Sequence, residues 1–147
     1  METYVVNRSI VILVIENNPD QQLLIGYSLR TSIPQAKLNF ATTANEALRY
    51  LYECSAGQLP CPKLILLNTH PSQGESGWQL LKELRTRYPR LPVLVLSAQH
   101  DPDFIRQSYE FGANSFIVKP QNLEGWELQF KRLAIYWLGV VTLPPAY

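Results

Sequence analysis

The sequence predicts an α/β domain of the doubly wound type, in which helices cover both faces of a parallel β-sheet. Short unbroken apolar runs recur along the chain, as is typical of parallel strands buried on both faces. A segment with helical periodicity follows each run, and repeated strand-then-helix units with right-handed crossovers build an open parallel sheet. We expect strands at 10–15, 64–67, 93–96 and 116–118, and an edge strand where Leu38 and Phe40 alternate with polar residues.

Residues that begin and end helices separate the predicted strands. Asn18 and Asp101 each precede a proline, which pairs an N-cap residue with a proline at the first helical position. Thr43 and Glu46 have the spacing of a capping box, and Gly112 is placed to end the fourth helix. The last helix carries apolar residues at helical spacing: Leu123, Trp126, Phe130, Leu133 and Trp137.

Composition and charge limit the classes of protein to consider. The chain has 147 residues, 46% of them hydrophobic and 17% charged, which suits one globular domain. A formal net charge of +1 gives no reason to expect a nucleic acid or membrane partner. The longest apolar run, 10–15, is too short to span a bilayer, and we see no signal peptide. We therefore expect a cytoplasmic protein in which Cys54 and Cys61 are reduced thiols, with a loop disulfide as the alternative.

Polar residues follow the predicted strands where each one ends. Ligands of doubly wound sheets bind beyond the carboxyl ends of the strands. Those positions hold Glu16 and Asn17 after the first strand, Asn68 after the third, Ser97 after the fourth and Lys119 after the fifth. The sequence therefore places any functional site among these five residues.

Four stretches around these residues carry a family resemblance. In order, "VILVIENNPD", "LILLNTHP", "VLVLSA" and "FGANSFIVKP" resemble the receiver domain of two-component response regulators over about residues 9–138. The resemblance implies the CheY-like, flavodoxin-like (βα)5 three-layer sandwich with strand order 2-1-3-4-5, and a cis bond before Pro120. We assign 1–138 to this domain and 139–147 to a C-terminal tail.

The resemblance also implies a site, and this chain departs from it. In the family, an acidic pair and an aspartate hold Mg²⁺, and the aspartate accepts a phosphoryl group from a histidine kinase. The acidic pair matches Glu16 and Asn17, and the phosphoacceptor position matches Asn68. Two of the three carboxylates are absent. We therefore expect a pseudo-receiver, unless the parent protein has aspartate at position 68 and Asn68 comes from engineered or deamidation-prone material.

Charge and nucleophilicity explain why the departure matters. Mg²⁺ is usually anchored by one or two carboxylates, and the charges of Glu16 and Lys119 sum to zero. An amide oxygen is a poor nucleophile, and covalent catalysis of this kind uses Asp or Glu. We expect no phosphorylation of Asn68, very weak or absent Mg²⁺ binding, no other cofactor and no enzymatic activity.

Three more positions match functional residues of the family. Ser97 and Phe116 match the switch residues, and Lys119 matches the lysine that contacts the phosphoryl group. Without a phosphoryl group we favour structural roles for Ser97 and Phe116, and an ion pair with Glu16 for Lys119.

Two features near the strand ends each have two interpretations. His70 and His100 could form a transition-metal site with Glu16, although loop histidines are more often simply solvated. The turn from Ser72 to Gly77, before Trp78, is about two residues longer than the family pattern. It either covers the pocket or is a tolerated insertion.

The C-terminal sequence suggests a class of partner. "YWLGVVTLPPAY" resembles the tail of small single-domain receivers that partner phytochrome-type histidine kinases. Tyr136 and Trp137 either extend the last helix towards a second subunit, giving the symmetric dimer that we slightly favour, or fold back onto their own domain.

Taken with the site, the tail leads to a functional expectation. We expect a stand-alone receiver in two-component (phosphorelay) signalling that acts by protein–protein contact. Its partners are expected to be a sensor histidine kinase or another receiver, which bind the face of the fourth helix, fifth strand and fifth helix.

Two alternatives remain. One is a conventional phosphorylated receiver that uses Ser97 or Glu16 as the acceptor. The other is a flavin carrier or phosphatase on the same fold. The second is disfavoured because "ENNPDQQ" has no glycine to cradle a phosphate and "IENNP" has no aspartate nucleophile.

Overall fold

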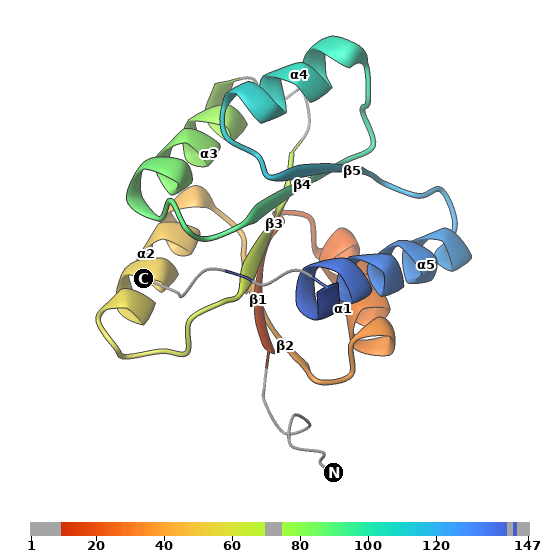
Figure 1. Cartoon of the computed structure of the whole chain (residues 1–147), viewed down its shortest axis with the longest axis horizontal. Helices are drawn as coiled ribbons and strands as arrows, with labels where there is room; N and C mark the ends of the chain where they lie inside the picture. Colours follow the sequence, from red (N-terminus) through yellow and green to blue (C-terminus); the bar gives the residue numbers. More distant parts are fainter. Residues whose placement is uncertain (1–9, 70–74, 141–142, 144–147) are drawn as a thin grey trace.

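A five-stranded parallel sheet lies between two layers of helices (Figure 1). The computed structural model describes residues 10–69, 75–140 and 143. The strand order is β2-β1-β3-β4-β5, which confirms the order that the family resemblance implies. The strands are β1 (Ile10–Ile15), β2 (Ala36–Ala41), β3 (Leu64–Asn68), β4 (Val93–Ser97) and β5 (Ser115–Val118).

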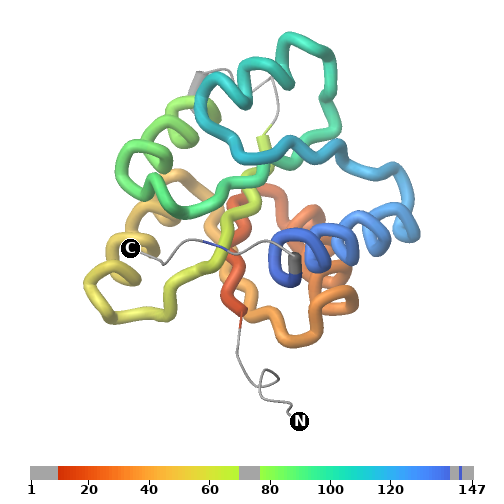
Figure 2. Tube along the Cα trace, in the orientation of Figure 1, coloured from red at the N-terminus to blue at the C-terminus, as the bar shows by residue number. Residues whose placement is uncertain are grey.

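The helices divide between the two faces of the sheet. They are α1 (Pro19–Ser32), α2 (Ala44–Ser55), α3 (Glu75–Arg87), α4 (Pro102–Glu110) and α5 (Leu123–Leu133), and α5 continues into a π-helical segment, η3 (Ala134–Val140). Helices α1 and α5 lie side by side on one face, and α2, α3 and α4 cover the other (Figures 1 and 2). None of the helices in the described residues is long and apolar enough to cross a membrane.

Two hydrophobic cores, one on each face, hold the layers together. Successive side chains of a strand point to opposite faces, so each central strand contributes to both cores. The core beneath α2, α3 and α4 contains the strand residues Leu13, Ile15, Ile65, Leu67, Val93 and Val95. The core beneath α1 and α5 contains Ile12, Val14, Leu64, Leu66, Leu94 and Leu96. This double burial explains the unbroken apolar runs in the sequence.

The predicted helix starts are confirmed by their hydrogen bonds. The Asn18 side chain accepts from the N–H groups of Asp20 (2.8 Å) and Gln21 (3.1 Å). Asp101 accepts from the N–H of Phe104 at the start of α4 (3.0 Å). These caps fix where the chain leaves β1 and β4, and so position the residues at the strand ends.

The capping box of α2 differs in one detail from the expected geometry. The Thr43 hydroxyl accepts from the N–H of Glu46 (3.1 Å), as expected. The Glu46 carboxylate accepts from the N–H of Thr42 (2.7 Å), one residue before the cap. The N–H groups of Glu46 and Thr42 are therefore both satisfied by side chains at this helix start.

Other expectations need correction. Strands β3, β4 and β5 are each one residue longer than predicted, because backbone pairing extends beyond the apolar run. The bond before Pro120, expected to be cis, is trans, since the described residues contain no cis peptide bond. The two isomers of an X–Pro bond differ by only about 1 kcal/mol, so a family pattern at this bond does not fix its geometry.

The last helix extends as far as the sequence suggested, through η3 to Val140. Trp137 is half-buried and packs against the core beneath α1 and α5. Tyr136 is 53% exposed, and its ring packs edge-on against the Trp137 ring with the centroids 5.4 Å apart. Trp137 therefore folds back onto its own domain, whereas Tyr136 and the neighbouring Ile135 face outward. A dimer through this surface stays a prediction.

Candidate functional site

The carboxyl ends of β1 and β3 form the rim of a cavity of about 360 Å³. Ile15 pairs with Leu67 across the two parallel strands, so the next residues, Glu16 and Asn68, lie side by side at this edge of the sheet. Asn17 also lines the cavity. The structure thus brings together the three residues that sequence reasoning assigned to the acidic-pair and acceptor positions.

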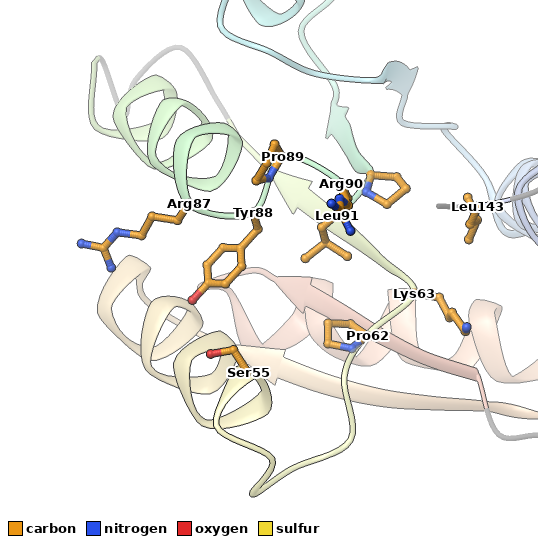
Figure 3. Close-up of a pocket in the computed structure, with 10 residues that line it drawn as sticks. Ser55, Pro62, Lys63, Arg87, Tyr88, Pro89, Arg90, Leu91 and Leu143 are labelled. Atoms are coloured by element: carbon orange, nitrogen blue, oxygen red, sulfur yellow. The ribbon is translucent and has the colours of Figure 1, made fainter. Parts of the chain in front are cut away.

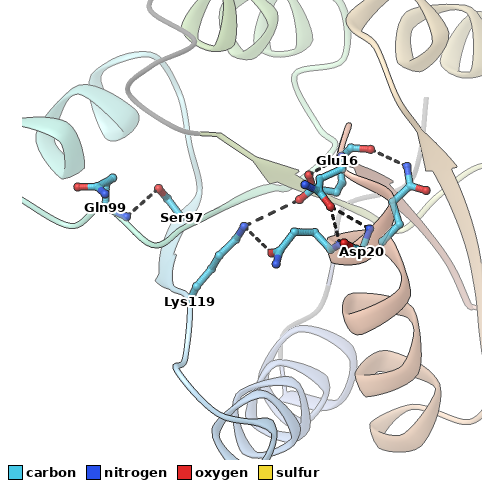
Figure 4. A network of polar contacts seen from close by, with 8 residues as sticks. Glu16, Asp20, Ser97, Gln99 and Lys119 are labelled. Atoms are coloured by element: carbon cyan, nitrogen blue, oxygen red, sulfur yellow. Dashed lines mark hydrogen bonds and ion pairs between the residues drawn. The ribbon is translucent and has the colours of Figure 1, made fainter.

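Glu16 is the most deeply buried charged group of the site, with 2% of its surface exposed. Its Oε2 accepts from the N–H of Asn18 (3.0 Å). The Gln22 side chain donates to the Glu16 backbone carbonyl (2.6 Å). Glu16 Oε1 lies 3.9 Å from Lys119 Nζ and has no hydrogen-bond partner among the described residues (Figure 4). The predicted ion pair is therefore present, but it is long.

Lys119 reaches the site from the end of β5. Its ammonium group donates to Gln21 Oε1 (2.9 Å) and points towards Glu16 (Figure 4). Burial lowers the pKa of Lys119, and the nearby Glu16 carboxylate opposes that shift. Gln21 was not predicted as a site residue. The one sequence signal for Gln21 was its position in the first turn of α1, whose N-cap closely follows the end of β1.

The two asparagines of the site have different environments. Asn17 is exposed to solvent, whereas Asn68 is half-buried. Asn68 Oδ1 is inaccessible and has no hydrogen-bond partner within the described part of the chain. Glu16 is the one carboxylate among the described residues that line the cavity, and Lys119 balances its charge. Such a neutral set of donors fits a resident Mg²⁺ poorly.

Ser97 is the last residue of β4 and Phe116 is the second residue of β5, and both take part in local structure. The Ser97 side chain is fully buried, and its Oγ accepts from the N–H of Gln99 (3.1 Å). The Phe116 ring packs edge-on against Phe104 with ring centroids 6.0 Å apart. The N–H of Phe116 donates to the Tyr109 hydroxyl (3.0 Å). The structural roles that the sequence analysis favoured for Ser97 and Phe116 stay predictions.

Trp78 lies directly after Gly77, a residue of the cavity wall. Its indole ring is 8% exposed and lies 5.0 Å from the Phe104 ring and 5.9 Å from the Phe111 ring. The indole N–H donates to Gln107 Oε1 (3.2 Å). Trp78 therefore joins α3 to α4 in the core. Of the turn expected from Ser72 to Gly77, residues 72–74 lie outside the described residues, and Glu75 to Gly77 form the start of α3 instead.

Only part of the suggested transition-metal site lies within the described residues. His70 lies outside the described residues, and His100 is exposed after β4. Within the described ranges, no group of three or more His, Cys, Asp or Glu side chains is placed to hold a metal ion.

The chain is similar to known signalling proteins over most of its length. A sequence model of the response regulator receiver domain matches residues 12–127. Response regulator Rcp1 of Synechocystis is 31% identical over 143 residues, covering 92% of this chain and 94% of Rcp1.

Solved structures show the same fold. The phosphorylated cyanobacterial phytochrome response regulator RcpA superposes with a TM-score of 0.80 at 29% identity, covering 94% of this chain and all of RcpA. The response regulator RPA3017, from red light signalling of R. palustris, gives a TM-score of 0.83 at 23% identity, with 93% and 99% covered. The second likeness shows the fold alone.

Proposed function

Because the chain belongs to the response regulator receiver family of two-component signalling, we propose that it works as a pseudo-receiver. In this proposal residue 68 is not phosphorylated, and the domain signals through contacts with partner proteins. Regulation then lies in constitutive binding, in competition with a phosphorylatable receiver, or in the amount of protein present.

The charge balance of the cavity carries the proposal. Glu16 is the sole carboxylate among its described lining residues, and Lys119 lies 3.9 Å from it. Mg²⁺ is usually anchored by one or two carboxylates in a net negative site, and here the formal sum is zero. Without the metal ion, nothing offsets the negative charge of an incoming phosphoryl donor. The amide of Asn68 also lacks the nucleophilic carboxylate on which acyl phosphate formation depends.

Burial and hydrogen bonding disfavour phosphorylation at the other two candidate acceptors, Ser97 and Glu16. The Ser97 hydroxyl is fully buried and engaged with Gln99. Glu16 is 2% exposed and bonded to the start of α1. Neither oxygen is open to an incoming phosphoryl donor without rearrangement.

The named relatives support a class of partner. RcpA is described as a phytochrome response regulator, and the chain also aligns with nearly all of Rcp1. We infer that the partner is a sensor histidine kinase, of the phytochrome type if the likeness extends to recognition, or else another receiver. RcpA is described in its phosphorylated form. The proposal therefore gives this chain the same class of partner as RcpA but no phosphorylation.

A homodimer is a further part of the proposal. The surface of α4, β5 and α5 exposes Tyr109, Val118 and Leu128, and η3 exposes Ile135 and Tyr136. Exposed large apolar side chains on adjacent elements are typical of protein contact surfaces. Either surface could join two copies of the chain or dock a kinase.

Titration with Mg²⁺ and beryllofluoride, followed by tryptophan fluorescence or NMR, tests the proposal. Trp78 is a suitable reporter because it follows Gly77 in the cavity wall. We expect no saturable change in the natural chain and a clear response in the Asn17→Asp/Asn68→Asp variant. The Gln58→Glu/Gln121→Glu variant adds the same charge at exposed positions and serves as the matched control. Saturable binding by the natural chain would overturn the pseudo-receiver assignment.

A further inference from the structure

A second cavity, of about 410 Å³, opens at the other end of the sheet from Asn68. Pro62 and Lys63, which precede β3, form one wall, and the loop from α3 to β4 forms the other (Figure 3). We call it the basal cavity. Its volume lies within the range of small-molecule sites, roughly 300–1,000 Å³. It shares no lining residue with the cavity around Glu16.

The loop from α3 to β4 is held in one shape. The N–H of Leu91 donates to the carbonyl of Tyr88 (3.1 Å), which closes a turn with Pro89 at its second position. The Arg85 guanidinium, behind the loop, donates to the carbonyls of Tyr88 (3.0 Å) and Leu91. Because proline and these bonds limit its freedom, this wall needs little ordering when a ligand binds.

The opposite wall is also fixed by side-chain bonds. The Tyr50 hydroxyl donates to the Pro60 carbonyl (2.9 Å), and the Cys54 thiol donates to the same carbonyl (3.2 Å). The Cys61 thiol donates to the Cys54 carbonyl (3.4 Å). These contacts tie the loop before β3 to the end of α2, so both walls are formed before binding.

The lining of the basal cavity combines an apolar floor with a cationic rim. Pro62, Leu91 and Pro92 are buried and form the floor. Lys63 and Arg90 are exposed at the rim, and no ion pair joins either of them to an acid within the described part of the chain.

Acidic side chains are missing from the described lining. Arg87, the third cation, is paired with Glu83 at 2.9 Å, which leaves the other two charges uncompensated. The described lining of the basal cavity therefore carries a local excess of positive charge.

We propose that the basal cavity binds a small organic anion with a flat apolar body, such as an aromatic carboxylate or sulfonate. Its ring lies on Leu91 and Pro62 beside the Tyr88 ring, and its charged group is held by Lys63 and Arg90. Arginine suits this role because its planar guanidinium both pairs with an anion and stacks on a ring. The volume of the cavity, about 410 Å³, is that of a small-molecule site, which favours a small molecule over a protein surface.

The experiment is an NMR titration of the full chain with naphthalene-1-sulfonate as the probe. Inorganic sulfate carries the charge without the ring, and naphthalene-1-methanol carries the ring without the charge. Lys63→Gln/Arg90→Gln is the test variant, and Lys131→Gln/Arg132→Gln, at exposed positions of α5, is the matched control. Both variants alter exposed side chains, so each is expected to fold, and a far-ultraviolet circular dichroism spectrum checks this.

We expect saturable shifts of the backbone amides of Ser55, Lys63, Tyr88 and Leu91 with naphthalene-1-sulfonate. Affinity for the probe should fall about tenfold in the test variant and stay unchanged in the control variant, because the lost contacts are charge-assisted. Sulfate should bind about tenfold more weakly than the probe because it lacks the apolar ring. Naphthalene-1-methanol should also bind about tenfold more weakly, because it lacks the charge.

Three results would each overturn the proposal. They are an unaltered affinity in the test variant, shifts centred elsewhere on the chain, or sulfate binding as tightly as the probe. None of these results bears on phosphorylation at Asn68, so the pseudo-receiver proposal is tested separately.

Discussion

Lys119 Nζ lies 3.9 Å from Glu16 Oε1, and their side chains are only 14% and 1% exposed. This pair links the end of β5 to the end of β1 across the site. Gln21 supports the lysine, and the start of α1 supports the carboxylate. An internal ion pair thus lies where the resemblance to the receiver family implies a metal ion.

Removing the lysine should cost more stability than removing the carboxylate charge. Lys119→Met leaves a buried carboxylate without its cation, and we expect the free energy of unfolding to fall by about 2–3 kcal/mol. Glu16→Gln leaves a lysine that still bonds Gln21, and should cost about 1 kcal/mol. Urea denaturation measures both. Lys131→Met, at an exposed position, should change little. Equal losses in the first two variants would show that the pair does not anchor the site.

The pH dependence of stability should reflect the buried thiol of Cys54. Burial raises the pKa of this thiol from 9.0 to about 11. Between these values the folded thiol keeps a proton that the unfolded chain has lost, so the free energy of unfolding falls as the pH rises. Burial also raises the pKa of Tyr50, which acts in the same direction.

Thermal or urea unfolding across this alkaline range tests the contribution of Cys54. Cys54→Ala should flatten the decline by up to about 1 kcal/mol per pH unit. An identical slope in the natural chain and in Cys54→Ala would rule out the thiol as its cause.

Two glycines with positive φ offer a matched pair of substitutions. Gly112 has φ of 112°, and a Cβ there would collide with the Arg85 side chain. Gly57 has φ of 84°, and a Cβ there would meet nothing within 4 Å. Both alanine variants incur backbone strain of about 1–2 kcal/mol. We expect Gly112→Ala to lose at least about 1 kcal/mol more than Gly57→Ala, since overpacking adds to the strain. Equal losses in urea denaturation would contradict the role of Arg85.

The strands and the strand-end residues could be predicted from sequence because burial and register leave a plain signal. The run from Ile10 to Ile15 is apolar throughout because both of its faces are covered, and its bounds are those of β1. Glu16 and Asn68 could be placed together because parallel neighbours end at the same edge. Ser115 was missed because it joins β5 through backbone pairing with Leu94, which hydropathy does not reveal.

The contacts that complete the site could not be predicted. The bond from Lys119 to Gln21 joins residues 98 positions apart and depends on how the first turn of α1 approaches the residue that follows β5. Trp78 could not be assigned to the core because the sequence does not fix how α3 approaches α4. The change from α-helix to π-helix at Ala134 likewise leaves no sign in the apolar periodicity of the last helix.

Intact-mass measurement after incubation with acetyl phosphate and Mg²⁺ tests the central claim most directly. The natural chain, with one carboxylate in the described cavity lining and an amide at position 68, is expected to keep its mass. The Asn17→Asp/Asn68→Asp variant is expected to gain one phosphoryl group and shows that the fold and reagents are competent. A gain of one phosphoryl group by the natural chain, mapped to Asn68, would contradict the account.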